Sequence, residues 1–147
     1  MTLRKLEPNA DALLGGEWLV SNGLGGYASG SIAGVPTRRF HGLLVAALPP
    51  PIGRALMLSE VAETVRVPDG TVYRLGGYEH QGRPTELDTT ALESIRLENG
   101  LPVWTYRMGG FVLEKRVHLV HLQNTVVIRW RLLEVPTPDA ALFAAGQ

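Results

Sequence analysis

Two arginines and a histidine crowd together in segment 37–42, directly after a glycine-rich stretch that opens at Asn22. A guanidinium group carries a planar fork of donors, which could grip an anion or hydrogen-bond a polyol. On a strand, Arg39 and His41 would share one face. Asn22, Arg38, Arg39 and His41 are therefore the candidate substrate-binding residues. Two interpretations stay open: these side chains line a cleft, or they pin the glycine-rich turn through its carbonyl groups.

Two other patterns suggest a cofactor or a metal ion. Segment 23–28 matches G-x-G-x-x-A, the dinucleotide fingerprint, which needs a helix after it and an acidic residue about 20 positions further on. The following SGSIAGVP is a poor helix former, and no carboxylate lies near position 45. His118 and His121 are three positions apart, so on a strand they face opposite sides. We expect no cofactor and no metal site.

Glycoside hydrolysis would need a pair of carboxyl groups, one to protonate the leaving group and one to attack or to activate water. Glu60 and Glu63 fall on opposite faces of a strand. Glu86 and Asp88 share a face, but they lie in a segment that reads as a loop. Exposed, solvating charges explain both pairs better. We therefore predict no catalytic residue in this chain.

Aromatic and basic residues of the later segments have competing interpretations. Trp104 and Tyr106 share a strand face, where they either stack against a sugar or, as we favour, fill the core. Lys115 interrupts the apolar set of the segment that begins at Phe111. Its ammonium group either extends to solvent or meets a carboxylate.

The composition excludes several classes of protein. The chain has 147 residues, with 14 basic and 14 acidic residues and no cysteine. This balance argues against a nucleic-acid partner, and the lack of cysteine excludes a thiol nucleophile and disulfides. No apolar run approaches the roughly 20 residues of a membrane-spanning helix, and the start of the chain lacks the apolar core of a signal peptide. We expect a cytoplasmic protein with no membrane partner.

Turn signals separate a series of short β-prone segments. The dipeptides at 22–23, 69–70 and 99–100 (Asn-Gly, Asp-Gly, Asn-Gly) are strong turn formers. No segment shows a convincing helical period. In the last segment, alternation predicts that Val126, Ile128, Trp130 and Leu132 share the buried face. We predict strands over 17–20, 39–48, 55–67 (two strands or one bent strand), 71–75, 90–98, 101–108, 111–121 and 125–134, and a loop over 76–87.

This succession predicts an all-β fold, an antiparallel β-sandwich. We divide the chain into an irregular lead-in over 1–16, the sandwich over 17–135, and an irregular or helical tail over 136–147. Open strand edges in such a sandwich would permit a homo-oligomer.

Segment 17–30 (EWLVSNGLGGYASG), Gly34 and segment 37–46 (TRRFHGLLVA) together resemble the N-terminal domain of bacterial and archaeal glycogen debranching enzymes of the amylo-α-1,6-glucosidase type. Segments 50–54, 58–59, 114–115 and 124–127 are also similar to that family. Phe40 stands where the family more often has Tyr. The resemblance runs over residues 17–133.

The resemblance implies a supersandwich-like β-domain that precedes an (α/α)6 barrel, as in glucoamylase-like enzymes. The barrel would carry the catalytic acid and base, so we expect this chain alone to be inactive and its sandwich to be incomplete. The intact enzyme would hydrolyse α-1,6 branch linkages of glycogen or a related α-glucan. Two alternatives remain, a stand-alone carbohydrate-binding β-sandwich and a structural or oligomerisation domain.

Overall fold

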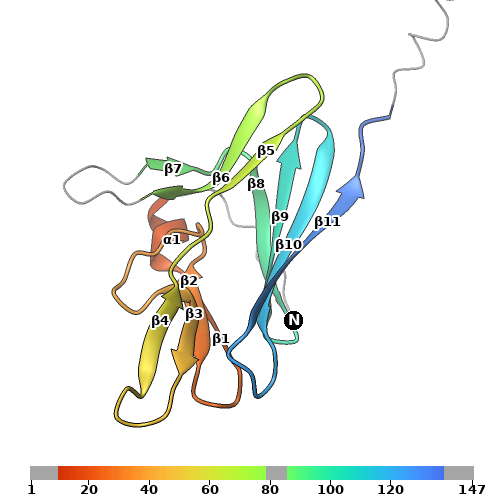
Figure 1. Cartoon of the computed structure of the whole chain (residues 1–147). Helices are drawn as coiled ribbons and strands as arrows, with labels where there is room; N and C mark the ends of the chain where they lie inside the picture. The colour runs from red at the N-terminus through yellow and green to blue at the C-terminus, as the bar shows by residue number, and fades with distance from the viewer. Residues whose placement is uncertain (1–9, 79–85, 138–147) are drawn as a thin grey trace, which may run out of the picture.

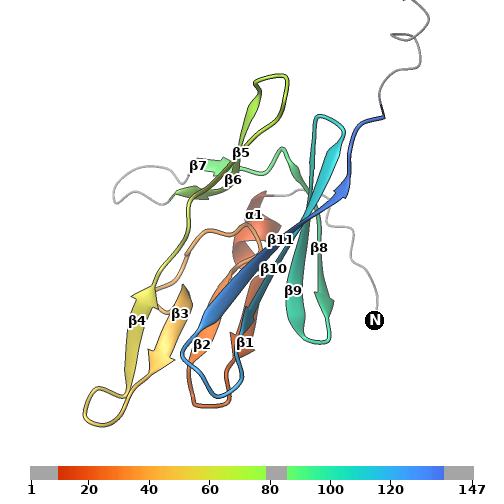
Figure 2. The same ribbon diagram turned by 45° about the vertical axis from the view of Figure 1, so that its right-hand side comes forward.

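A computed structural model describes residues 10–78 and 86–137, which form an antiparallel β-sandwich (Figure 1). Two four-stranded sheets pack against each other, and a three-stranded sheet lies at one end of them. Turned by 45°, the molecule shows β10 and β11 crossing in front of β1 and β2 (Figure 2). The predicted all-β, antiparallel class is confirmed.

The first sheet has the order β1-β2-β3-β4. Its second strand was not predicted, because the sequence YASGS reads as part of a glycine-rich turn. Gly30 suits this strand because a Cβ there would lie 3.2 Å from Nε1 of Trp18, so a side chain would crowd the indole ring. The strands are β1 (Glu17–Ser21), β2 (Tyr27–Ser31), β3 (Gly42–Ala47) and β4 (Arg54–Leu58).

The second sheet has the order β11-β10-β9-β8, as a simple meander. Asn99 (φ 51°) and Gly100 (φ 80°) both adopt the left-handed conformation that a tight hairpin turn requires, which confirms that predicted turn. The strands are β8 (Leu92–Glu98), β9 (Leu101–Met108), β10 (Phe111–Leu119) and β11 (Val126–Glu134). All four agree with the predicted segments to within two residues.

The third sheet consists of β5 (Glu63–Arg66), β6 (Val72–Tyr78) and β7 (Glu86–Asp88). Segment 55–67 is thus two strands, one of the two alternatives. The predicted loop over 76–87 is wrong at both ends, because Gly76 pairs with Asp88 and Tyr78 pairs with Glu86. The middle of that segment lies outside the described residues.

The core lies between the two large sheets. Trp18 of β1 meets Trp104 of β9 edge-to-face, with ring centroids 5.4 Å apart. Trp104 and Tyr106 are both buried, which confirms the core interpretation and removes the sugar platform. The predicted inner face of β11 holds as far as Trp130, but Leu132 is 52% exposed close to a register shift between β10 and β11.

The N-terminal lead-in is not wholly irregular, because residues Ala10–Gly15 form a short helix, α1. Leu13 is buried against Ala33 and Val35, and its carbonyl oxygen accepts a hydrogen bond from the Ala33 amide (3.1 Å). Burial of the Leu13 side chain stabilises this helix, although its sequence shows only a weak helical pattern. Across the described ranges, no helix combines the length and apolarity needed to cross a membrane. The predicted tail lies outside the described residues from 138 onward.

Candidate functional site

Residues 38–41 form a β-turn, in which the His41 amide donates to the carbonyl oxygen of Arg38 (3.0 Å). The predicted strand over 39–48 is therefore too long, since β3 begins only at Gly42. Arg39 and Phe40 occupy the two central positions of this turn. Strand alternation does not apply there, so Arg39 and His41 point differently: Arg39 is exposed and His41 is buried.

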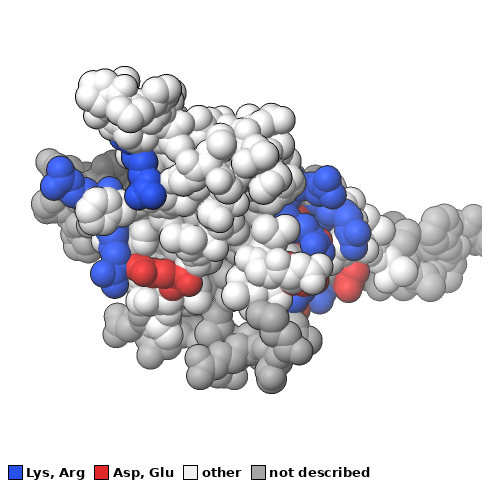
Figure 3. Space-filling model, turned by 90° about the horizontal axis from the view of Figure 1, so that it is seen from below, with Lys and Arg blue, Asp and Glu red and all other residues white. Residues whose placement is uncertain are grey.

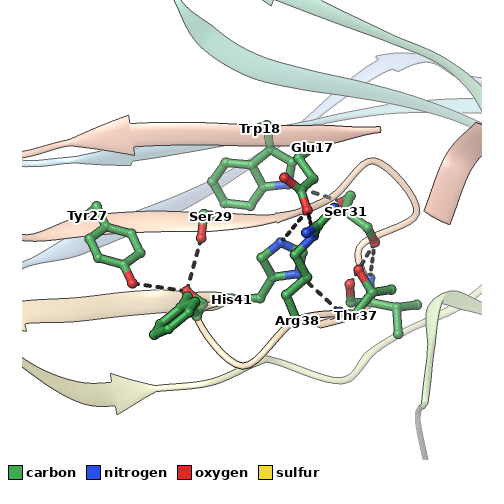
Figure 4. A network of polar contacts seen from close by, with 10 residues as sticks. Glu17, Trp18, Tyr27, Ser29, Ser31, Thr37, Arg38 and His41 are labelled. Atoms are coloured by element: carbon green, nitrogen blue, oxygen red, sulfur yellow. Dashed lines mark hydrogen bonds and ion pairs between the residues drawn. The ribbon is translucent and has the colours of Figure 1, made fainter. Parts of the chain in front are cut away.

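His41 and Arg38 fasten the 38–41 turn to β1 (Figure 4). Nδ1 of His41 accepts a hydrogen bond from the Thr37 amide (3.0 Å), so the ring proton lies on Nε2. That nitrogen faces Oε1 of Glu17 at 3.3 Å. Arg38 forms an ion pair with the same carboxylate oxygen. The structure thus gives both side chains a pinning role, with β1 as the anchor and not the glycine-rich turn.

Strand β2 also holds the 38–41 turn, through two hydrogen bonds. The carbonyl oxygen of Phe40 accepts hydrogen bonds from the Tyr27 hydroxyl (3.1 Å) and from Oγ of Ser29 (3.2 Å). The backbone of the turn is therefore held at several points, while its two central side chains remain outside. Phe40 is 71% exposed. Arg39 forms no hydrogen bond or ion pair with any described residue.

An open cleft of about 430 Å³, which we call the turn cleft, lies beside these two side chains. Its volume is within the range of small-molecule sites. Arg54 from β4 is held there by two contacts: Nε donates to the Gly25 carbonyl oxygen (2.9 Å), and the guanidinium carbon lies 5.7 Å from the centre of the Tyr27 ring. The lining residues are Tyr27, Arg39, Phe40, His41, Val45, Arg54 and Leu56.

The charge around the turn cleft is one-sided. None of its lining residues is acidic, and the nearby Glu17 already pairs with Arg38 and His41. Seen from the loop end of the sandwich, basic side chains gather on the side of β4 and on the side of the β8–β11 sheet, and acidic side chains lie beside both groups (Figure 3). The turn cleft therefore favours a ligand with negative charge or many hydroxyl groups.

Asn22 lies elsewhere, in the interior, with 1% of its surface exposed. Its Oδ1 accepts from the amides of Leu24 (2.9 Å) and Gly26 (3.0 Å). Its Nδ2 donates to the Gln123 carbonyl oxygen (2.9 Å) and to Oδ1 of Asn124 (3.2 Å). These four contacts use its hydrogen-bonding capacity and link the glycine-rich turn to the β10–β11 turn. The structure does not bring Asn22 to the turn cleft.

Among known protein families, a family model described as "Glycogen debranching enzyme N terminal" matches residues 16–143. The chain belongs to this family. The match spans the 38–41 turn, the turn cleft and every strand of the part of the chain that the structure describes. Comparison with curated proteins and with solved structures gave no match.

Sequence reasoning missed the aromatic side chains of Tyr27 and Phe40 and the guanidinium group of Arg54, which all line the cleft of this glycogen debranching enzyme N-terminal domain. Tyr27 pairs with Val45, and Val45 pairs with Leu56, so a row across β2, β3 and β4 forms the floor of the cleft. Only the register of these three strands shows that row. Without β2 in the predicted set, no sequence signal could place Tyr27 beside Arg54.

A buried ion pair lies on the inner side of the second sheet. Nζ of Lys115 lies 2.5 Å from Oε2 of Glu63, and each side chain is 11% exposed. The ammonium group also lies 5.6 Å and 5.5 Å from the ring centres of Trp104 and Trp130. Lys115 thus meets a carboxylate, one of the two alternatives, and ties β5 to the core. Burial, with the nearby Glu63 charge, raises the pKa of Tyr106.

The space beside this ion pair is too small for a sugar. The cavity there has a volume of about 40 Å³, room for no more than a few water molecules. Among the described residues, no group of three or more His, Asp or Glu side chains is arranged to hold a metal ion. The turn cleft is therefore the better candidate for a ligand site.

Proposed function

We propose that this domain is the non-catalytic N-terminal part of an enzyme that hydrolyses α-1,6-glucosidic branch linkages of glycogen or a related α-glucan. The observation that carries the proposal is the family match over residues 16–143. The partner of the domain would be an (α/α)6 catalytic domain, which supplies the acid and the base, and the setting would be the cytoplasm.

The state of the carboxylates supports a non-catalytic role. A glycosidase acid must hold its proton near neutral pH, which requires a raised pKa. Burial acts to raise the pKa of Glu114, but hydrogen bonds from Arg116 and Arg96 lower it below its ordinary value. Hydrogen bonding from Arg96 likewise lowers the pKa of Glu98. The carboxylates paired with basic side chains are those of Glu17, Glu63, Glu93, Glu98, Glu114 and Glu134.

Within this proposal the turn cleft faces the α-glucan. Arg39 supplies a guanidinium group that no described residue uses, and Phe40 supplies an exposed ring on a fixed backbone. His41 and Arg38 hold the turn in position, and Asn22 holds the neighbouring loop. Direct contact with the glucan therefore belongs to Arg39 and Phe40, and the other three candidates act as positioning residues.

Affinity electrophoresis in gels that contain glycogen tests this contact. The wild-type chain should be retarded, and Arg39→Ala and Phe40→Ala should each migrate faster than wild type in glycogen but equally in its absence. Trp104→Ala is not a suitable probe, because that ring is buried. Equal migration of wild type and both variants in glycogen would contradict a role for the turn cleft.

The turn cleft also favours a second candidate function, a carbohydrate-binding module that acts without a catalytic partner. In that case the purified chain should be retarded in glycogen but should leave the hydrolase activity of a separately produced (α/α)6 catalytic domain unchanged. A rise in that activity when the chain is added would contradict the second candidate.

A structural or oligomerisation role is a weaker candidate that rests on the edge strands. β4 and β11 each have a hydrogen-bonded neighbour on only one side among the described strands, and unpaired edges can accept another chain. Light scattering should then show a dimer whose population rises with concentration. A monomer at high concentration would count against it.

A further inference from the structure

We propose that the turn cleft binds a phosphorylated glucosyl unit, with the phosphate held between the guanidinium groups of Arg39 and Arg54. The phosphate part of this inference rests on the charge and the geometry of the cleft. The glucosyl part rests on the proposed function, because only the family links the chain to α-glucans.

The turn cleft carries positive charge that no acidic residue of its lining neutralises. Two arginines line the cleft, and no aspartate or glutamate lines it. Only Nε of Arg54 donates a hydrogen bond to the protein, to the Gly25 carbonyl oxygen. Its terminal nitrogens have no protein acceptor among the described residues. The Arg39 guanidinium group has no protein acceptor among the described residues. A phosphate monoester carries nearly two negative charges at pH 7 and accepts paired hydrogen bonds from guanidinium groups.

The turn backbone and the Arg54 side chain are fixed before any ligand arrives. The backbone of the 38–41 turn is anchored by Glu17 through His41, and by Tyr27 and Ser29 through the Phe40 carbonyl oxygen. The Arg54 guanidinium group is oriented by the Gly25 carbonyl oxygen and by the Tyr27 ring. A pre-organised site loses less conformational entropy on binding. The Arg54 cation therefore stands beside the cleft at little cost, whereas binding must still order the Arg39 side chain on its anchored turn.

The remaining walls of the turn cleft are largely apolar. Tyr27, Phe40, Val45 and Leu56 offer rings and aliphatic groups, and the volume is about 430 Å³. Small-molecule sites commonly combine such apolar walls with a few charged groups that fix orientation. A pyranose ring has apolar faces and hydroxyl edges, so a sugar that carries a phosphate would use both parts of the cleft.

Isothermal titration calorimetry on the purified 147-residue chain tests the inference with three soluble probes: glucose 6-phosphate, inorganic phosphate and maltotriose. Glucose 6-phosphate should bind more tightly than the other two. Its affinity should fall as salt is raised from about 0.01 M to about 0.15 M.

Arg39→Ala should weaken binding of glucose 6-phosphate by roughly tenfold or more, the scale expected for one charged hydrogen-bond donor. This variant should fold normally, because the side chain has no partner among the described residues. Arg54→Lys keeps the charge but loses the fork, and should also weaken binding. Arg129→Ala, an exposed arginine on β11, is the matched control and should bind as wild type does.

Several results would overturn the inference. They are no binding of glucose 6-phosphate, equal binding by Arg39→Ala and wild type, or tighter binding of maltotriose that is insensitive to salt. Binding of an acidic peptide at Arg39, with no binding of the phosphate ester, would instead indicate a protein-docking surface and would also overturn it.

A second experiment, with glycogen in the gel, distinguishes phosphate carried by the polymer from free hexose phosphate. If the phosphate belongs to the polymer, phosphatase treatment of the glycogen in the gel should reduce retardation of the wild-type chain. If free hexose phosphate is the ligand, it should bind in calorimetry while phosphatase treatment has no effect on retardation. Glycogen retardation without any phosphate binding would sustain the proposed function and refute the inference. Phosphate binding without retardation would sustain the phosphate part of the inference and refute contact between the turn cleft and glycogen.

Discussion

The buried pair of Lys115 and Glu63 gives the sharpest stability prediction. The two side chains come from different sheets, lie 2.5 Å apart and are each 11% exposed. Removal of one partner leaves a charge in the core without its counter-charge, which typically costs about 3–5 kcal/mol. Because both groups keep some contact with water, we expect the lower end, about 3 kcal/mol, for Glu63→Gln and for Lys115→Met.

Urea unfolding followed by tryptophan fluorescence measures this cost directly, since Trp104 and Trp130 both adjoin the ammonium group. The double variant Glu63→Gln/Lys115→Met should lose less stability than the sum of the two single variants, because neither charge is then left alone. Glu60→Gln is the control: this exposed carboxylate is close in sequence, and its loss should change stability by no more than about 0.5 kcal/mol.

Single variants that lose no more stability than Glu60→Gln would contradict this prediction. A double variant whose loss of stability equals the sum of the two single losses would also contradict it. Either result would mean that the ammonium and carboxylate groups do not stabilise each other in the folded protein.

Four further predictions concern the rest of the sandwich. Asn22→Ala should cost about 3 kcal/mol in urea unfolding, since two backbone amides lose their acceptor; a loss below about 0.5 kcal/mol would contradict its bridging role. Gly26→Ala should lower the Tm in calorimetry, because a Cβ would lie 2.7 Å from Nδ2 of Asn22 and 3.0 Å from a β3 carbonyl oxygen; an unchanged Tm would be inconsistent with so close an approach. Glu98 and Glu114 have folded-state pKa values below their ordinary 4.5, so the stability they contribute is present above that pH and is lost as the pH falls through the folded values; Arg96→Met should flatten the Tm profile below pH 4.5. The pKa of Tyr106 is raised from 10.0, so stability should fall as the pH rises above 10; Tyr106→Phe should lessen that fall.

The sequence predicted the second sheet well because its strands are linked by local signals. Asn99 and Gly100 both adopt positive φ, and the strands on either side of that turn pair directly from Glu98 and Leu101 onward. β2 could not be predicted in the same way. Its small residues make sense only once Trp18 is known to cover Gly30, which is a contact between neighbouring strands.

The candidate site shows the same division between local and distant information. The sequence singled out Arg39 and His41 by residue type, but strand alternation gave them the wrong geometry because the segment turns at 38–41. The partner of His41 is Glu17, and Arg54 reaches the cleft from β4. Such partners depend on strand register, which a single sequence does not specify when one strand is missing from the prediction.

The central claim is that this chain is a non-catalytic domain of a glycogen debranching enzyme. Incubation of the purified 147-residue chain with a branched limit dextrin, followed by assay of released glucose, tests it most directly. We expect no glucose above the protein-free control at any protein concentration. Sustained glucose release in proportion to the protein, abolished by substitution of one of its own carboxylates, would contradict it.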